Sequence, residues 1–162
     1  MATATLRLEI VTPESKAYSD DVEMVVLPAI EGEIGVYPMH VPLMTQLVAG
    51  ELIVTKDGKT SHLAVGEGFV EITQERVNVL VDMAIEERHI DEGAAEAAVK
   101  RAEEALARAH ELGAEETAAV QASLMKSLAQ LHVKRRRRGY QSRRPQAEAL
   151  TRLTRNAWTS PV

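Results

Sequence analysis

Histidine is the residue type in this chain best suited to acid–base or metal chemistry, yet the spacing of the histidines favours neither. The chain contains no Walker-type glycine loop, no Gly-x-Ser-x-Gly elbow, no His-Glu-x-x-His pair and no cysteine. A β-sandwich could gather His40 and His62 around a metal, but the clustered histidines and glutamate of such sites are missing. We therefore expect no catalytic and no metal-binding residues. The histidines, far apart in the sequence, are His40, His62, His89, His110 and His132.

The segment from Gly32 to Leu43 is the most informative part of the chain. It combines two glycines, two prolines and one histidine between strand-like stretches. Glycine permits unusual backbone angles, and proline fixes φ and removes a donor, so we predict a shaped loop instead of a regular element. His40 either hydrogen-bonds nearby backbone or helps to form a docking surface, and the two are compatible. The residues of this predicted partner-docking loop are Glu31, Gly32, Glu33, Gly35, Tyr37, Pro38, His40 and Pro42.

Short strands joined by tight turns are predicted on both sides of this segment. Apolar and polar residues alternate over 5–10, which is the period of a half-buried strand. Asp57-Gly58 is typical of a two-residue β-hairpin turn, because both positions tolerate positive φ. The pattern predicts an antiparallel β-sandwich or barrel that ends near Glu87. Further strands are expected at 22–27, 51–56, 59–65, 69–72 and 77–81.

Helical spacing replaces the strand pattern in the second half of the chain. Asp91 can cap a first helix, in which alanines recur at helical spacing up to a Leu-Gly stop at 112–113. A second helix is expected from Ala114 or Glu115 to about Arg137. The short connection makes the two helices antiparallel neighbours. The apolar row of the second helix is Val120, Leu124, Leu128 and Leu131, with Met125 beside it.

The expected fold class is therefore α+β, an N-terminal antiparallel β-sandwich followed by a C-terminal antiparallel αα-hairpin. The first helix offers mainly alanine, and each methyl-sized group contributes only about 0.8 kcal/mol when buried. Two such helices alone would be marginal. We infer that the helical hairpin gains stability by docking on the β part and can undock when a partner offers a better surface. A static helical appendage is the alternative.

Charge is distributed unevenly along the chain. The net charge is -5, but the segment from Val133 to the end is near +8 and the preceding part near -13. A basic tail on an acidic body favours an acidic partner, nucleic acid or an anionic surface; a solvated tail without a partner is the alternative. Within 139–162, a short basic amphipathic helix beside Trp158 could touch anionic lipid, whereas disorder is the prediction that we adopt. The basic residues are Lys134, Arg135, Arg136, Arg137, Arg138, Arg143, Arg144, Arg152 and Arg155.

Several motifs in this order resemble the epsilon subunit of F-type ATP synthases. The resemblance covers roughly Leu6 to Arg138. It rests on the segment 32–43, on Gly50 before a strand, on Val65-Gly66-Glu67-Gly68-Phe69-Val70-Glu71-Ile72, and on Ile90-Asp91 at the start of an alanine-rich helix.

The resemblance implies a non-catalytic rotor subunit that couples proton-driven rotation to ATP synthesis. Its ten-stranded sandwich, expected at 1–87, would pack against the gamma subunit and the c-ring. Its helical hairpin, expected at 88–138, would lie on the sandwich or extend to the catalytic head and restrain ATP hydrolysis. The segment 139–162 extends past the usual family end and is expected to be flexible. The residues implicated in regulation are Ile90, Asp91, Leu124, Leu128 and Leu131, and those expected to contact the beta subunit, with the alpha subunit as a further candidate, are Lys134, Arg135, Arg136, Arg137 and Arg138.

One departure from the family concerns a regulatory nucleotide. The resemblance implies a comparison with bacterial members that bind ATP through an Ile-Asp-x-x-Arg-Ala segment. In this chain Ala94 stands at the position of the arginine. We therefore expect no cofactor, although substitution by Lys100 or Arg101 stays open. The membrane association is expected to be indirect, at the cytoplasmic face of a bacterial membrane, and an organelle-encoded chain would look the same.

Two other classes of function agree less well with the sequence than the rotor subunit does. A nucleic-acid-binding adaptor would want aromatic residues among the basic ones, but only Tyr140 and Trp158 are available, and the acidic body would repel phosphates. A small β-sandwich metalloenzyme is the third possibility. We expect no nucleic-acid partner.

Overall fold

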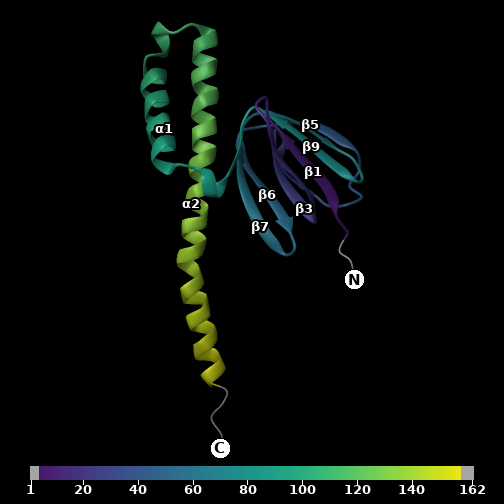
Figure 1. The fold of residues 1–162 in the computed structure, drawn as a ribbon. Helices are drawn as coiled ribbons and strands as arrows, with labels where there is room; N and C mark the ends of the chain where they lie inside the picture. The colour runs from purple at the N-terminus through teal and green to yellow at the C-terminus, as the bar shows by residue number, and fades with distance from the viewer. Residues whose placement is uncertain (1–3, 158–162) are drawn as a thin grey trace, which may run out of the picture.

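The computed structural model describes the backbone of residues 4–157 and the side chains of residues 4–136. In this part of the chain, ten strands form one sheet that folds over on itself, and two long helices stand beside it (Figure 1). The predicted fold class, a β-sandwich followed by a helical hairpin, is confirmed. The strands are β1 (Leu6–Val11), β2 (Lys16–Val22), β3 (Met24–Ala29), β4 (Gly32–Val36), β5 (Leu43–Leu47), β6 (Gly50–Lys56), β7 (Lys59–Val65), β8 (Gly68–Ile72), β9 (Arg76–Val81) and β10 (Ala84–Glu86).

The sheet order is β10-β7-β6-β3-β5-β8-β9-β1-β2, and β4 pairs with β3 off this path. The predicted Asp57-Gly58 turn joins β6 to β7, and both of its residues have positive φ, 51° and 68°. One pair departs from the antiparallel expectation, because β1 runs parallel to β9. Parallel neighbours need a long connection, and here the connection is the seven strands between them in sequence.

The core lies between the two layers of the sandwich. Alternate residues of each strand point inward, as the pleat requires, and the fully buried ones are almost all aliphatic. The strands between Leu6 and Val81 supply every member of this cluster. The sandwich therefore closes its core without help from the helices. Its largest buried side chains are Leu8, Ile10, Leu27, Leu47, Leu52, Leu63 and Ile72.

The segment 32–43 is more regular than the sequence predicted. Gly32–Val36 is strand β4 and Leu43 begins β5, so the irregular loop is only 37–42. The expectation of a loop throughout was wrong because glycines do not prevent strand pairing. Gly32 turns the chain with φ 122°, and the residues after it then pair with β3.

The helical part consists of two short 3₁₀ turns and two α-helices. The 3₁₀ turn η1 (Glu87–His89) leads from β10 into α1 (Glu92–Ala107), and η2 (Ala109–Glu111) leads into α2 (Ala114–Ala157). The Asp91 carboxylate accepts a hydrogen bond from the Ala94 backbone N–H at 3.0 Å, so the predicted N-cap of α1 is confirmed.

Helix α2 does not stop near Arg137 as expected. Its backbone continues as a helix to Ala157 although the added segment contains Gly139 and Pro145, because many of its other residues are Arg, Ala, Leu and Gln, which are good helix formers. The side chains from Arg137 onward and the whole of Trp158 lie outside the described residues. The predictions made for them, including the flexibility of 139–162, stay predictions.

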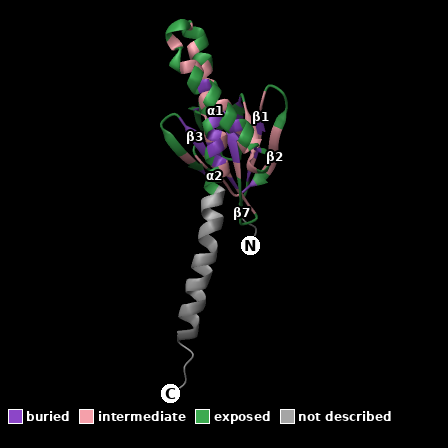
Figure 2. Ribbon diagram, turned by 90° about the vertical axis from the view of Figure 1, so that its left-hand side faces the viewer, coloured by how far each residue is buried: buried purple, intermediate pink, exposed green. Residues whose placement is uncertain are grey.

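Helices α1 and α2 form an antiparallel hairpin, and α2 crosses the outer face of β6 and β7 (Figures 1 and 2). Figure 2 shows the buried residues of α2 gathered where it passes the sheet. The end of the hairpin where α1 turns into α2 projects past the sandwich in both views. Only part of the hairpin therefore touches the sandwich. None of the described helices is long and apolar enough to cross a membrane.

Candidate functional site

The first candidate site is the interface between α2 and the outer face of the sandwich. Its apolar part is small: Ala64, Ile90 and Val133 are buried together, and Met83 and Ile85 pack against them. The sandwich core, by comparison, contains 18 buried aliphatic residues. Since apolar burial scales with area, this seam contributes far less stabilisation than the core does.

Polar contacts surround the apolar seam. The Lys126 ammonium lies 2.6 Å from the Asp82 carboxylate, and the Gln130 side-chain amide donates to the Met83 sulfur at 3.2 Å. Lys126 and Asp82 are both partly exposed, and pairs of this kind typically contribute about 0–1 kcal/mol. The rim of the interface is therefore specific but weak.

Glu51 is the centre of the polar interface. Its side chain is only 5% exposed, and its two oxygens face three basic groups. His62 Nδ1 lies 2.7 Å from Oε1, Arg136 donates a short hydrogen bond to Oε2, and His132 Nε2 lies 3.8 Å from Oε2. His62 comes from β7, whereas the other two come from α2. One carboxylate of the sheet thus joins the sheet to the helix.

The basic cluster, Lys134 to Arg138, meets carboxylates of its own chain in its described part. Lys134 Nζ donates to the Glu87 carbonyl at 3.1 Å and lies 3.6 Å from the Glu87 carboxylate. Arg135 bonds Glu96 at 2.7 Å and lies 3.6 Å from Glu92, and the Glu96 carboxylate raises the pKa of Arg135. The cluster expected to contact another subunit is thus paired internally. Arg137 and Arg138 lie outside the described side chains.

The regulatory residues expected on the hairpin occupy different environments. Ile90 and Leu131 are buried and Leu124 is half-buried, while Asp91 caps α1. Leu128, by contrast, is 42% exposed. Among the residues of α2 up to 136, the buried positions are Ser127, Ala129, Leu131 and Val133, so the buried face overlaps only partly with the expected apolar row. Leu128 and Met125 line an open groove beside Glu33, Ala49, Gly50, His132, Arg135 and Arg136.

The second candidate site is the predicted docking loop. Glu31, Gly32, Glu33 and Gly35 are exposed on the β3–β4 turn and on β4. The loop 37–42 is held by its backbone: Met39 adopts a φ of 68°, and its N–H donates to the Gln74 carbonyl at 2.8 Å. His40 Nδ1 lies 2.7 Å from the Val41 carbonyl, in agreement with the prediction that it hydrogen-bonds nearby backbone. Tyr37 and Pro42 are exposed, and Pro38 and His40 are half-buried.

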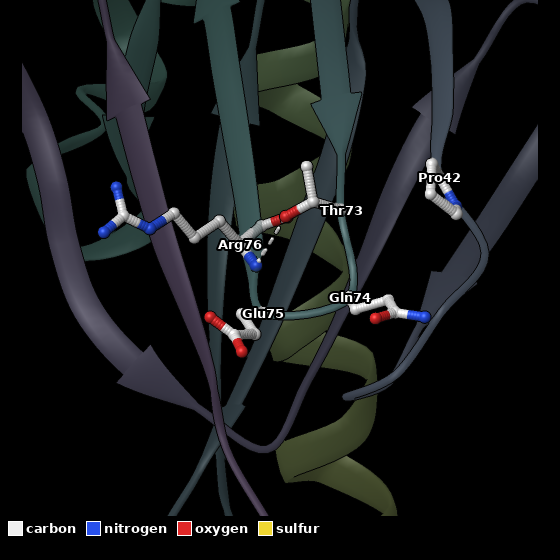
Figure 3. A pocket seen from close by; sticks show the side chains of 5 residues that line it. All are labelled: Pro42, Thr73, Gln74, Glu75 and Arg76. Atoms are coloured by element: carbon white, nitrogen blue, oxygen red, sulfur yellow. Dashed lines mark hydrogen bonds between the residues drawn. The ribbon is translucent and has the colours of Figure 1, made fainter.

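A shallow hollow separates this loop from the β8–β9 turn (Figure 3). Pro42 lines one side of it, and the other side is the turn from Thr73 to Arg76. Thr73 Oγ1 accepts a hydrogen bond from the Arg76 backbone N–H at 3.0 Å, which fixes the turn. The hollow combines a rigid loop with a rigid turn, which suits it to shape recognition more than to chemistry.

A third surface lies on the side of the sandwich away from the helices, where Figure 1 places β5 and β9. Phe69 of β8 is opposite Leu80 of β9, and the two side chains are 57% and 55% exposed. Met44 of β5 is 69% exposed on the same face. Neighbouring exposed apolar residues of this size are typical of a protein–protein contact. The loop residues Tyr37, Met39 and Val41 are exposed as well.

The structure does not group the histidines for metal binding. His62 bonds Glu51 and His40 bonds backbone, and within the described residues no three His, Asp or Glu side chains could hold a metal ion together. Sequence reasoning missed Glu51, Asp82 and Lys126, and it considered His62 only as a metal ligand and not as the partner of Glu51. The alternation of β6 places Glu51 on the face opposite Leu52, but it does not reveal that a helix covers that face.

Comparisons with known proteins give a consistent result. The sequence profile of the family "ATP synthase, Delta/Epsilon chain, beta-sandwich domain" matches residues 5–87, and that of the "long alpha-helix domain" matches 88–135. The ATP synthase epsilon chain of Alkalilimnicola ehrlichii is 40% identical over 136 residues, which are 83% of this chain and 96% of that one. The epsilon chain of Pelotomaculum thermopropionicum is 46% identical over 108 residues, 67% of this chain and 81% of that one.

Among solved structures, a chain of the Euglena gracilis mitochondrial ATP synthase (OSCP/F1/c-ring in rotational state 1) has a similar fold. The TM-score is 0.64 at 21% identity, over 75% of this chain and 76% of that chain. At this identity the likeness concerns the fold alone.

Proposed function

This chain belongs to the family of ATP synthase epsilon chains, and we propose that it is a non-catalytic subunit of the central stalk of an F-type ATP synthase. In this proposal it turns with the rotor and helps to couple proton-driven rotation to ATP synthesis. Its place is peripheral, at the cytoplasmic face of a bacterial membrane, and it reaches the membrane through the complex.

The sandwich is the docking part in this proposal. The exposed apolar surface around Phe69, Leu80 and Met44, together with the rigid loop 37–42, suits it to pack against the gamma subunit and the c-ring. Because the sandwich closes its own core, it can keep its shape whatever the helices do. The shape of the loop and the exposed apolar area both belong to the sandwich, and each supports its role in docking.

The helical hairpin is the regulatory part. The observation that carries this proposal is the contrast between a large closed core and a small seam edged by charges, which is what reversible docking needs. When the hairpin extends from the sandwich, Arg136 of the basic cluster leaves Glu51 and becomes available to acidic residues of the beta subunit in the catalytic head, and this contact restrains ATP hydrolysis. Contacts of this kind are electrostatic and sensitive to salt.

Two further points belong to the proposal. We propose no regulatory ATP, since Ala94 has no guanidinium and its backbone N–H is used by the Asp91 cap; Lys100 and Arg101 are exposed on α1. We propose no nucleic-acid partner, because the acidic body of the chain would repel a phosphate backbone.

The test is the ATPase activity of the epsilon-depleted catalytic head, titrated with the full chain and with a chain that ends at Glu87. Binding is followed in the same samples. We expect both to bind and only the full chain to suppress hydrolysis. If both bind and neither suppresses, the chain couples without restraining; if neither binds, the rotor proposal is wrong.

A further inference from the structure

We propose that Glu51 is an internal latch. By this we mean that its carboxylate holds the regulatory helix α2 on the sandwich through an ion pair with Arg136 of the basic cluster. The observation is a buried acid in an unusual place. Glu51 projects from the outer face of β6, where α2 lies over the sheet, and its side chain is 5% exposed. This inference rests on the proposed function for its consequence, but its structural part concerns the chain alone.

A buried carboxylate at this position needs basic side chains beside it, so the docked state depends on the groups that pair with Glu51. Removing a charge from water costs several kcal/mol unless it is paired and hydrogen-bonded. Here His62 supplies one pair from the sandwich, while Arg136 and His132 arrive only with α2. When the helix leaves, water replaces these two partners and Glu51 returns to an ordinary exposed strand position. The latch therefore selects one docked position of the helix without making the docking irreversible.

The pairs of the basic cluster differ in what they tie together. Arg135 pairs with Glu92 and Glu96 of α1, so this pair stays within the hairpin when the hairpin moves. Lys134 pairs with Glu87 in the connection η1. Of the described pairs of this cluster, the pair of Arg136 with Glu51 is the one that reaches a strand of the sandwich. It must break when α2 undocks.

The latch and an external acidic partner then compete for the same cation. While α2 is docked, the Arg136 guanidinium is bound to Glu51 and is not available to another carboxylate. An acidic surface of the catalytic head that captures Arg136 leaves Glu51 with one partner fewer, which favours release of the helix. Docking on the sandwich and binding to an acidic partner are therefore mutually exclusive at this residue.

The test uses the isolated full chain, whose lack of cysteine allows two labels to be placed cleanly. Spin labels at the exposed positions Lys59 of β7 and Gln121 of α2 report the distance between sandwich and hairpin. Glu51→Gln keeps the shape and removes the charge, and we expect the ratio of undocked to docked chains to rise about tenfold, equivalent to about 1.4 kcal/mol. An unchanged distance distribution would overturn the latch.

Two further variants protect the test from an effect of misfolding. Arg136 is 54% exposed on a helix and is no part of the sandwich core, so Arg136→Gln leaves that core intact and should release the hairpin as Glu51→Gln does. The double variant should add little to either single one, because both remove the same pair. The matched control is Glu9→Gln, which removes a β1 carboxylate paired with Lys16 and should leave the distance unchanged. Docking in Arg136→Gln at the wild-type level would overturn the proposal.

A second readout separates this inference from the proposed function. The same variants are added to the epsilon-depleted catalytic head and hydrolysis is measured. Glu51→Gln should suppress hydrolysis at a lower concentration than the wild type, because fewer chains start docked and Arg136 is free. Release of the hairpin without any change in hydrolysis would support the latch and overturn the restraint of hydrolysis.

Discussion

The sandwich and the helical hairpin are held in different ways. Every member of the sandwich core comes from the strands between Leu6 and Val81, and nearly all its side chains are excluded from water. The hairpin meets the sandwich through three buried residues and a ring of charged contacts. Apolar burial is insensitive to direction and partner, whereas ion pairs can be exchanged for other ion pairs. The comparison indicates that the sandwich is a permanent platform, whereas the helical hairpin is an attached part that can dock and undock.

The largest effect is expected in the platform. Leu27→Ala removes a side chain that is fully buried in the sandwich and should lower the free energy of unfolding by about 2–5 kcal/mol. Leu128→Ala is the matched control: the same change at a side chain that is 42% exposed should cost less than about 1 kcal/mol. Chemical denaturation of both variants measures this. Equal losses would mean that the hairpin is part of the same cooperative unit.

Two glycines separated by one residue sharpen the comparison. A Cβ on Gly68 would lie 1.9 Å from the Leu80 carbonyl oxygen, so Gly68→Ala forces β8 and β9 apart and should cost about 1–3 kcal/mol or more of sandwich stability. A Cβ on Gly66 would instead lie 1.9 Å from the Asp82 carboxylate, which can rotate away and release Lys126.

Gly66→Ala should therefore leave the melting of the sandwich nearly unchanged and increase the exposure of α2 to limited proteolysis. Gly68→Ala should do the reverse. If both lower the melting temperature equally, the β7–β8 turn belongs to the platform alone and does not report on docking.

Val133→Ala tests the apolar seam itself. Val133 is 1% exposed at the contact of α2 with the sheet, and the loss of two methyl groups should weaken docking by about 1–2 kcal/mol. The signal is a faster exchange of α1 amide hydrogens while those of β3 and β6 keep their rates. A matching acceleration in the strands would contradict the separation of the two parts.

The smallest expected effect is a change of stability with pH, and it arises from a charged pair within the sandwich. Lys56, which hydrogen-bonds Asp20, holds the pKa of that carboxyl below its ordinary value and links β6 to β2. The carboxyl of Asp20 is ionised at neutral pH in both states, and its ion pair with Lys56 then stabilises the folded chain. As the pH falls, the unfolded chain takes up a proton here before the folded chain does, and the stabilisation decreases. It is lost as the pH falls through the lowered pKa.

Asp20→Asn should accordingly lower the melting temperature slightly at neutral pH, and the difference from wild type should vanish as the pH falls through the lowered pKa of Asp20. Melting curves of both proteins over this range provide the measurement. A difference that stays constant with pH would show that the charge of Asp20 is not the cause.

Much of this comparison could be predicted from the sequence. Period-2 alternation located β1, the turn residues Asp57-Gly58 located the hairpin of β6 and β7, and the capping residue Asp91 located the start of α1, because these signals are local. The parallel pairing of β1 with β9 and strand β4 were missed, since they depend on which distant strands meet. Glu51 was missed for the same reason: its burial is created by a helix that lies 85 residues away in sequence at Arg136.

The most direct test of the central claim is amide hydrogen exchange of the full chain, resolved by peptide. If the hairpin docks reversibly on a self-sufficient sandwich, α1 and the part of α2 before residue 136 should exchange through local opening, at least about 100-fold faster than β3, β6 and β8. Protection of the hairpin equal to that of the sandwich core would contradict the account, because the two parts would then open only together.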